Sequence, residues 1–135
     1  MAERTRETSV TVACIMLVVG AAVTTIPAER FTLAWTHSIE KLRWEEDYVL
    51  RPQGLAPVAA RIRGSGAGME IPEGAVLRNG VWHYVPQRTP LPALLLARST
   101  YVADYELCWD GSCRTIAQMV PRAASDEAAE IRPCR

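Results

Sequence analysis

The polar segment after Thr36 contains the side chains best suited to nucleophilic chemistry. His37 and Ser38 are adjacent there, and Glu40 follows two residues later. A histidine activates a serine hydroxyl only when the two side chains lie within hydrogen-bond distance of each other. Neighbouring residues of an extended segment point to opposite faces, which prevents that contact. We therefore expect a polar strand end with no catalytic role, and we keep His37, Ser38 and Glu40 as candidate binding residues.

The acidic run Glu45-Glu46-Asp47 is a second candidate, in this case for a bound cation. Calcium loops spread their carboxylates over alternate positions and include a turn glycine, and this run does neither. The sequence around it alternates as a strand does, with Glu46 on the same side as Trp44 and Tyr48. A carboxylate on the aromatic side is unusual for a core strand. We expect a solvated strand edge here and no metal site.

Glycines are concentrated in the segment Gly64-Ser65-Gly66-Ala67-Gly68. A phosphate-binding loop would continue with Gly-Lys-Ser/Thr, and a nucleophile elbow would need a glycine two residues before Ser65, where Arg63 stands. Glycine more simply allows a bulge, or the close approach of a backbone or a ligand. Gly66 and Gly68 are therefore candidate binding residues, and no cofactor is expected.

Cys108 and Cys113 flank the sequence Trp109-Asp110-Gly111-Ser112. Asp-Gly is a strong signal for a two-residue hairpin turn, because both turn positions need positive φ. Such a turn places the two cysteines opposite each other as a non-hydrogen-bonded pair, near the spacing that a disulfide requires. We predict a Cys108–Cys113 disulfide, with free thiols or a metal or redox site as the alternatives, and hence an oxidising compartment. We expect Cys134 to be an unpaired thiol, and Cys14 to lie in a membrane or in a removed segment.

Short apolar runs separated by turn signals extend from residue 29 to residue 120 and favour an all-β domain. Asn79-Gly80 marks another two-residue hairpin. We expect about seven short strands that form a small β-sandwich or a barrel-like domain. A polar tail, residues 121–135, follows, and Ser125 is placed to cap a short helix that ends at Ile131.

The uncharged stretch Thr8–Ala28 precedes this domain. As a helix, the 17 residues of its apolar centre Val10–Ile26, or all 21 residues, would be about 26–31 Å long, close to the hydrocarbon thickness of a bilayer. Arg4 and Arg6 place the N-terminus in the cytoplasm, so that everything after Pro27 is exported. We expect residues 1–28 to be an N-terminal hydrophobic helix that serves as an uncleaved anchor, with a cleaved signal peptide as the alternative. The domain would then lie on the periplasmic side of the inner membrane, in a single-pass protein.

The charges balance, because 15 basic and 15 acidic side chains give a formal net charge of zero. A nucleic-acid-binding protein normally carries a clear basic excess, so we expect no nucleic-acid partner. Lys41 is the single lysine in the sequence, and arginines supply the other basic side chains. We interpret this bias as a genome preference, with a phosphate or carboxylate site as the alternative.

Several segments together resemble one protein family. They are the strand Phe31–Thr36, the motif His37-Ser38-Ile39-Glu40, an acidic-aromatic strand, the motif Gly66-Ala67-Gly68-Met69 and a closing hairpin. Residues 31–119 are in this way similar to the DUF1850 family, small bacterial and archaeal proteins with an N-terminal hydrophobic segment. Members are often encoded beside TAXI-type TRAP transporters, which are tripartite solute importers driven by ion gradients. The family has no established enzymatic role, so the resemblance supplies no catalytic residue.

The resemblance implies a membrane-anchored, extracytoplasmic accessory subunit of a TAXI-type TRAP transporter. Its partners would be the membrane, through the N-terminal helix, and the transporter's membrane subunit or its solute-binding protein. A periplasmic small-ligand-binding module is the main alternative, with a site built around His37–Glu40 and Gly64–Met69. A hydrolase with an unrecognised site is a third hypothesis. Because the sequence contains no catalytic constellation, we expect the protein not to be an enzyme.

Overall fold

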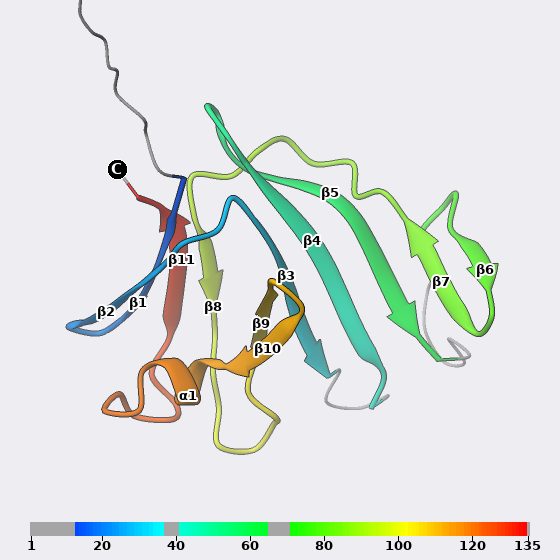
Figure 1. Ribbon diagram of the computed structural model, residues 1–135. Helices are drawn as coiled ribbons and strands as arrows, with labels where there is room; N and C mark the ends of the chain where they lie inside the picture. Colours follow the sequence, from blue (N-terminus) through cyan, green and yellow to red (C-terminus); the bar gives the residue numbers. More distant parts are fainter. Residues whose placement is uncertain (1–12, 37–40, 65–70, 135) are drawn as a thin grey trace, which may run out of the picture.

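The computed structural model describes residues 13–36, 41–64 and 71–134. Within these residues the chain forms eleven strands and one short helix, and the strands make two β-sheets around a shared core (Figure 1). The all-β prediction is therefore right, and the two sheets share one core as the strands of a sandwich do. The expected number of about seven strands is too low, because the described residues form eleven.

The larger sheet has seven strands in the order β10-β9-β3-β4-β5-β7-β6, and each strand is antiparallel to its neighbours. The long strands β4 and β5 form its centre (Figure 1). Its strands are β3 (Arg30–Thr36), β4 (Arg43–Arg51), β5 (Gly54–Arg63), β6 (Val76–Arg78), β7 (Val81–Tyr84), β9 (Glu106–Trp109) and β10 (Ser112–Thr115).

The smaller sheet has four strands in the order β2-β1-β11-β8. They are β1 (Ile15–Val19), β2 (Ala22–Ile26), β8 (Leu94–Leu96) and β11 (Ala129–Pro133). Strand β1 lies between β2 and β11, and it pairs with β11 along its whole length. The beginning and the end of the described chain therefore close the domain together.

The prediction of an N-terminal hydrophobic helix is wrong, because the described part of the apolar stretch, from residue 13 onward, contains the β1–β2 hairpin. Val19 pairs directly with Ala22, which leaves Gly20 and Ala21 as a two-residue turn. Gly20 has a φ of 60°, a value that favours glycine at the first position of such a turn. Every second residue of β1 is fully buried, as in a strand with one face in a core. No helix in the described residues is long and apolar enough to span a membrane.

The core lies between the two sheets and takes side chains from both. Phe31 of β3 stacks on Tyr48 of β4, with their ring centroids 5.4 Å apart. The main buried members of the core are Ile15, Leu17, Val19, Ile26, Phe31, Leu33, Tyr48, Leu55, Leu94, Leu96, Leu107, Ile116, Val120, Ala129 and Ile131. The segment predicted to be a membrane helix thus supplies part of the core.

The two predicted hairpin turns are confirmed. Asp110 and Gly111 have φ values of 52° and 77°, and Asn79 and Gly80 have values of 51° and 77°. The first turn pairs the two cysteines of its hairpin directly across β9 and β10. Their Cα atoms are 4.0 Å apart and their sulfurs are bonded, so the predicted Cys108–Cys113 disulfide is confirmed.

The tail prediction is wrong in one respect, because residues 125–128 form no helix and Ala129–Pro133 form strand β11. Ala129 and Ile131 are buried, whereas the alternate residues Glu130 and Arg132 are more exposed. The one described helix, α1 (Ile116–Met119), lies earlier in the chain and begins with a capping box.

The predictions for the other two cysteines are also wrong. Cys14 and Cys134 form a disulfide, with their Cα atoms 5.4 Å apart and 120 positions between them in the sequence. It lies next to the β1–β11 pairing, and the Cys134 backbone N–H also donates to the Cys14 carbonyl at 3.0 Å. Neither cysteine is therefore a free thiol, and the disulfide joins the first strand of the domain to the last.

The connection between β7 and β8 is attached to the sheet at one residue pair. Leu91 and Leu55 exchange two backbone hydrogen bonds of 2.7 and 2.9 Å. Gly54 precedes this contact with a φ of 129°, and a Cβ atom at this position would collide with the Leu91 carbonyl. Glycine is required there because the two backbones approach each other closely.

Candidate functional site

The outward side of the seven-stranded sheet, away from the core, has a row of paired charges that we call the charged face. In antiparallel strands, directly opposite residues share a face, and Glu45 lies opposite Arg61 while Arg43 lies opposite Arg63. The residues of the charged face are Arg43, Glu45, Asp47, Arg61, Arg63 and Glu106.

Glu45 is the centre of the charged face, and its residue is 8% exposed. Its carboxylate accepts hydrogen bonds from the Nε atoms of Arg43 and Arg61, both at 2.8 Å, and of Arg63 at 3.2 Å. Burial alone would raise the pKa of Glu45, but the hydrogen bonds from the three guanidinium groups outweigh it and lower the pKa to about 2. Glu45 therefore stays charged and holds β4 and β5 in register.

Asp47 forms the strongest single pair of the charged face. Arg61 binds its carboxylate with both terminal nitrogens, at 2.7 and 2.9 Å, and the Thr32 hydroxyl donates to it at 2.7 Å. Burial opposes ionisation, but the bonds from Arg61 and Thr32 outweigh it and lower the pKa of Asp47. Its carboxylate is consequently a weak base, which is unsuited to activating the threonine hydroxyl.

At the β5–β7–β6 side, the row of charges continues onto strands β7 and β6, which contain no carboxylate side chain. Arg61 lies opposite His83 of β7, and Val81 of the same strand lies between Arg63 on β5 and Arg78 on β6. We call Arg63, Arg78 and His83 the basic edge. A cavity of about 510 Å³ opens there and is lined by side chains that include Arg61, Arg78 and His83.

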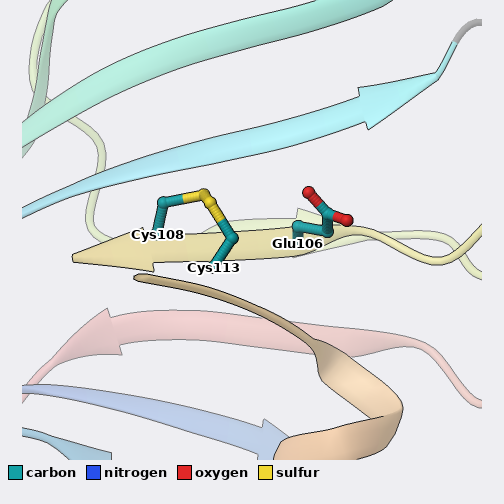
Figure 2. Close-up of side chains that lie close together, drawn as sticks. All are labelled: Glu106, Cys108 and Cys113. Carbon is teal, nitrogen blue, oxygen red and sulfur yellow. A yellow bond between two sulfur atoms is a disulfide. The ribbon is translucent and has the colours of Figure 1, made fainter. Parts of the chain in front are cut away.

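At the opposite side, the charged face ends beside a disulfide. Arg43 pairs with Glu106 of β9 at 2.9 Å, and Glu106 shares one side of β9–β10 with Cys108 and Cys113 (Figure 2). The three side chains offer metal-ligating atoms within 4.8 Å of one another. The two sulfurs are bonded to each other, however, and metals such as zinc bind cysteine as the thiolate. This group is therefore not a metal site in the oxidised protein.

On the inward side of the sheet, Glu46 takes the aromatic-side position that its sequence context indicated. Its carboxylate accepts a hydrogen bond of 2.5 Å from the Tyr48 hydroxyl and one of 2.8 Å from Arg88. Burial, followed by the hydrogen bond to Glu46 and then the charge of that carboxylate, raises the pKa of the Tyr48 hydroxyl. Arg88 belongs to the connection between β7 and β8, so this ion pair holds the connection against the sheet.

The predicted binding residues His37, Ser38, Glu40, Gly66 and Gly68 lie outside the described residues. The strands that precede them end close together. Thr36 at the end of β3 and Arg63 at the end of β5 both pair with Arg43. The two candidate segments therefore start from the same end of the sheet.

The arginines that pair with the acidic run were not predicted from the sequence. Glu45 and Asp47 were expected on a solvated strand edge, yet they lie on a central strand with Arg61 facing them from β5. The signal was present, because the alternation of a strand through the β5 segment places Arg61 and Arg63 on one face. Only the pairing of that strand with β4 was missing.

Taken together, the charged face and the Glu46 ion pair are suited to binding and to holding strands in place. In the described part of the chain, neither of them joins a nucleophile to a base of ordinary pKa. At the basic edge, Arg78 and His83 have no acidic partner among the described residues, whereas Arg63 is paired with Glu45.

A family model described as "Domain of unknown function (DUF1850)" matches residues 31–116. Strands β1, β2 and β11, which make up most of the four-stranded sheet, lie outside the matched residues. No curated protein and no solved structure is significantly similar to the chain. Because the match covers more than half of the sequence, the chain belongs to the DUF1850 family.

Proposed function

We propose that this protein works outside the cytoplasm as an accessory subunit of a TAXI-type TRAP transporter, where it assists assembly or docking of the solute-binding protein. The proposed location outside the cytoplasm rests on one observation: all four cysteines are paired in two disulfides. Disulfides persist in oxidising compartments and are rare in the cytosol. The proposed association with a transporter rests on the DUF1850 family, whose members are often encoded beside TAXI-type TRAP transporters.

The described surface supports a binding role more than a catalytic one. The acids of the charged face are neutralised by arginines, and their lowered pKa values make them poor proton acceptors. Two disulfides and a core shared by both sheets give a rigid domain, and rigid surfaces dock with little change of shape. An accessory subunit that presents a fixed surface to a larger assembly fits these properties.

Purification of the tagged protein from detergent-solubilised membranes, at native expression, tests this function. We expect the transporter's membrane subunit or its solute-binding protein to be recovered with it in a fixed ratio. An unrelated exported domain with the same tag, prepared in parallel, should recover neither of them. Repeated recovery of the tagged domain alone would contradict the transporter association, whatever compartment the protein occupies.

A further inference from the structure

At the basic edge, basic side chains lie close together on neighbouring strands, which lowers the stability of the sheet unless negative charge offsets it. Like charges placed across neighbouring strands destabilise a sheet. Arg61 and His83 face each other directly, and Arg63 and Arg78 lie on either side of Val81 in the next row. All of these side chains are on the outward side of the sheet, because the buried Ile62 lies between Arg61 and Arg63 on the opposite face.

The nearby acidic groups are already engaged on the other side of β5. Arg61 holds Asp47 with two bonds and Glu45 with a third, and Arg63 also reaches only Glu45 among the described acids. Strands β6 and β7 contain no acidic residue. The one acid that lines the cavity is Glu73, which is exposed and forms no ion pair with a described residue. The positive charge of Arg78 and the imidazole N–H of His83 are therefore available to a ligand.

The cavity beside these groups is large enough for a small organic molecule. Its volume is about 510 Å³, and its walls also include Val76, Val85 and the amide side chain of Gln87. It lies at the end of the seven-stranded sheet that is distant from the four-stranded sheet (Figure 1). A ligand can occupy it without disturbing the core.

We propose that the basic edge binds a small-molecule carboxylate, held by Arg78 and His83 and attracted by the positive charges of Arg61 and Arg63. A guanidinium group offers two parallel N–H donors that match the two oxygens of a carboxylate. The apolar walls contact the carbon chain, and Gln87 offers a further amide to a second polar group. This assignment gives the small-ligand-binding alternative a site and a ligand class, and it does not depend on the transporter association.

His83 provides a direct readout of this site. Desolvation, followed by the charges of Arg78, Arg61 and Arg63, lowers the pKa of His83, and Glu73 is the acid that lines the same cavity. A bound carboxylate adds negative charge and favours the protonated imidazole. The sequence contains two histidines, so His83 is assigned by comparison with His83→Gln, and His37 serves as an internal reference.

The test is a titration of the intact protein with succinate, followed by NMR of the histidine side chains and by calorimetry. We expect saturable binding, a raised pKa of His83 only, and at least tenfold weaker affinity in Arg78→Gln. Arg122→Gln removes another exposed arginine, from the connection between α1 and β11, and should change affinity less than twofold.

Three results would overturn the assignment. The first is an equal effect of sodium chloride at the same ionic strength, since this would mean simple screening. The second is an equal loss of affinity in Arg122→Gln and Arg78→Gln. The third is tighter binding of inorganic phosphate than of succinate, which would replace the carboxylate by a different ligand class.

Discussion

Leu17 and Ile131 lie directly opposite each other on β1 and β11, and both side chains are completely buried. One belongs to the apolar stretch at the beginning of the chain, and the other to the polar tail. Their contact shows that the four-stranded sheet exists only when the two ends of the chain come together. The N-terminal stretch is thus part of the folded domain.

Replacing Leu17 by alanine tests this placement. The change removes a fully buried side chain from the core, so we expect it to lower the free energy of unfolding by about 2–5 kcal/mol. Leu95→Ala is the matched control, because Leu95 is 80% exposed and its loss should cost no more than about 0.5 kcal/mol. Denaturant unfolding of both variants measures the difference. An unchanged stability in Leu17→Ala would contradict the position of β1.

The two disulfides should differ in their contribution to stability. A disulfide restricts the unfolded chain more strongly as the closed loop lengthens. The Cys14–Cys134 bond closes 120 positions and should contribute about 5 kcal/mol in the chain-entropy model, against about 2 kcal/mol for the 5 positions of Cys108–Cys113. Double alanine variants of each pair, compared by denaturant unfolding, give both values. A larger loss for the short hairpin pair would contradict this ranking.

Glu45→Gln should alter the dependence of stability on pH. The folded-state pKa of Glu45 is about 2, below the ordinary value of 4.5, so its contribution is complete above pH 4.5 and is lost as the pH falls toward 2. At pH 7 we expect the variant to be less stable by about 2–3 kcal/mol, because charged hydrogen bonds are lost.

The same variant gives a second comparison at low pH. The difference in unfolding free energy between the natural protein and Glu45→Gln should decrease between pH 4.5 and pH 2. Glu130→Gln is a suitable control, since Glu130 pairs only loosely with Arg132, at 3.8 Å on an exposed face. A difference that stays constant over this pH range would show that Glu45 is not held by the three arginines.

Gly54→Ala should destabilise the attachment of the β7–β8 connection. Gly54 has a φ of 129° and lies against the Leu91 carbonyl, so the added methyl group causes both backbone strain and a collision. Gly74→Ala introduces strain alone, because no atom lies within 4 Å of its Cβ position at a φ of 85°. We expect about 1 kcal/mol for Gly74→Ala and at least about 3 kcal/mol for Gly54→Ala by thermal unfolding. Equal losses would contradict the close approach.

The features that were predicted correctly from the sequence are local. Asp110-Gly111 and Asn79-Gly80 specify their turns within four residues, because the positive φ values suit those residue types. The Cys108–Cys113 bond follows from the first turn by strand geometry alone. These predictions needed no knowledge of how distant segments pack.

The errors concern contacts between distant segments. The stretch Thr8–Ala28 has the length and apolar composition of a membrane helix, and five-residue strands on each side of a Gly-Ala turn have the same composition. Its many β-branched residues, such as Val18, Val19 and Val23, favoured strands and were the available signal. The partner of β1 is β11, about 115 residues later, and no local pattern identifies it.

The candidate site was predicted only in part for the same reason. The position of Glu46 on the aromatic side was visible in the alternation of β4, but its partner Arg88 lies 42 residues away. The basic edge depends on the alignment of three strands, and a shift of one residue would move Arg63 to the other face. The alternation along one strand indicates which of its residues share a face. Which residues of other strands lie beside them is known only from the strand pairing in the folded protein.

Mapping of the disulfides in protein taken directly from its native cells tests the central claim most directly. Thiols are blocked by alkylation before lysis, the protein is digested without reduction, and the linked peptides are identified by mass spectrometry. We expect Cys14 linked to Cys134 and Cys108 linked to Cys113, with no alkylated cysteine. Four alkylated thiols would contradict both the fold of the chain ends and the extracytoplasmic location.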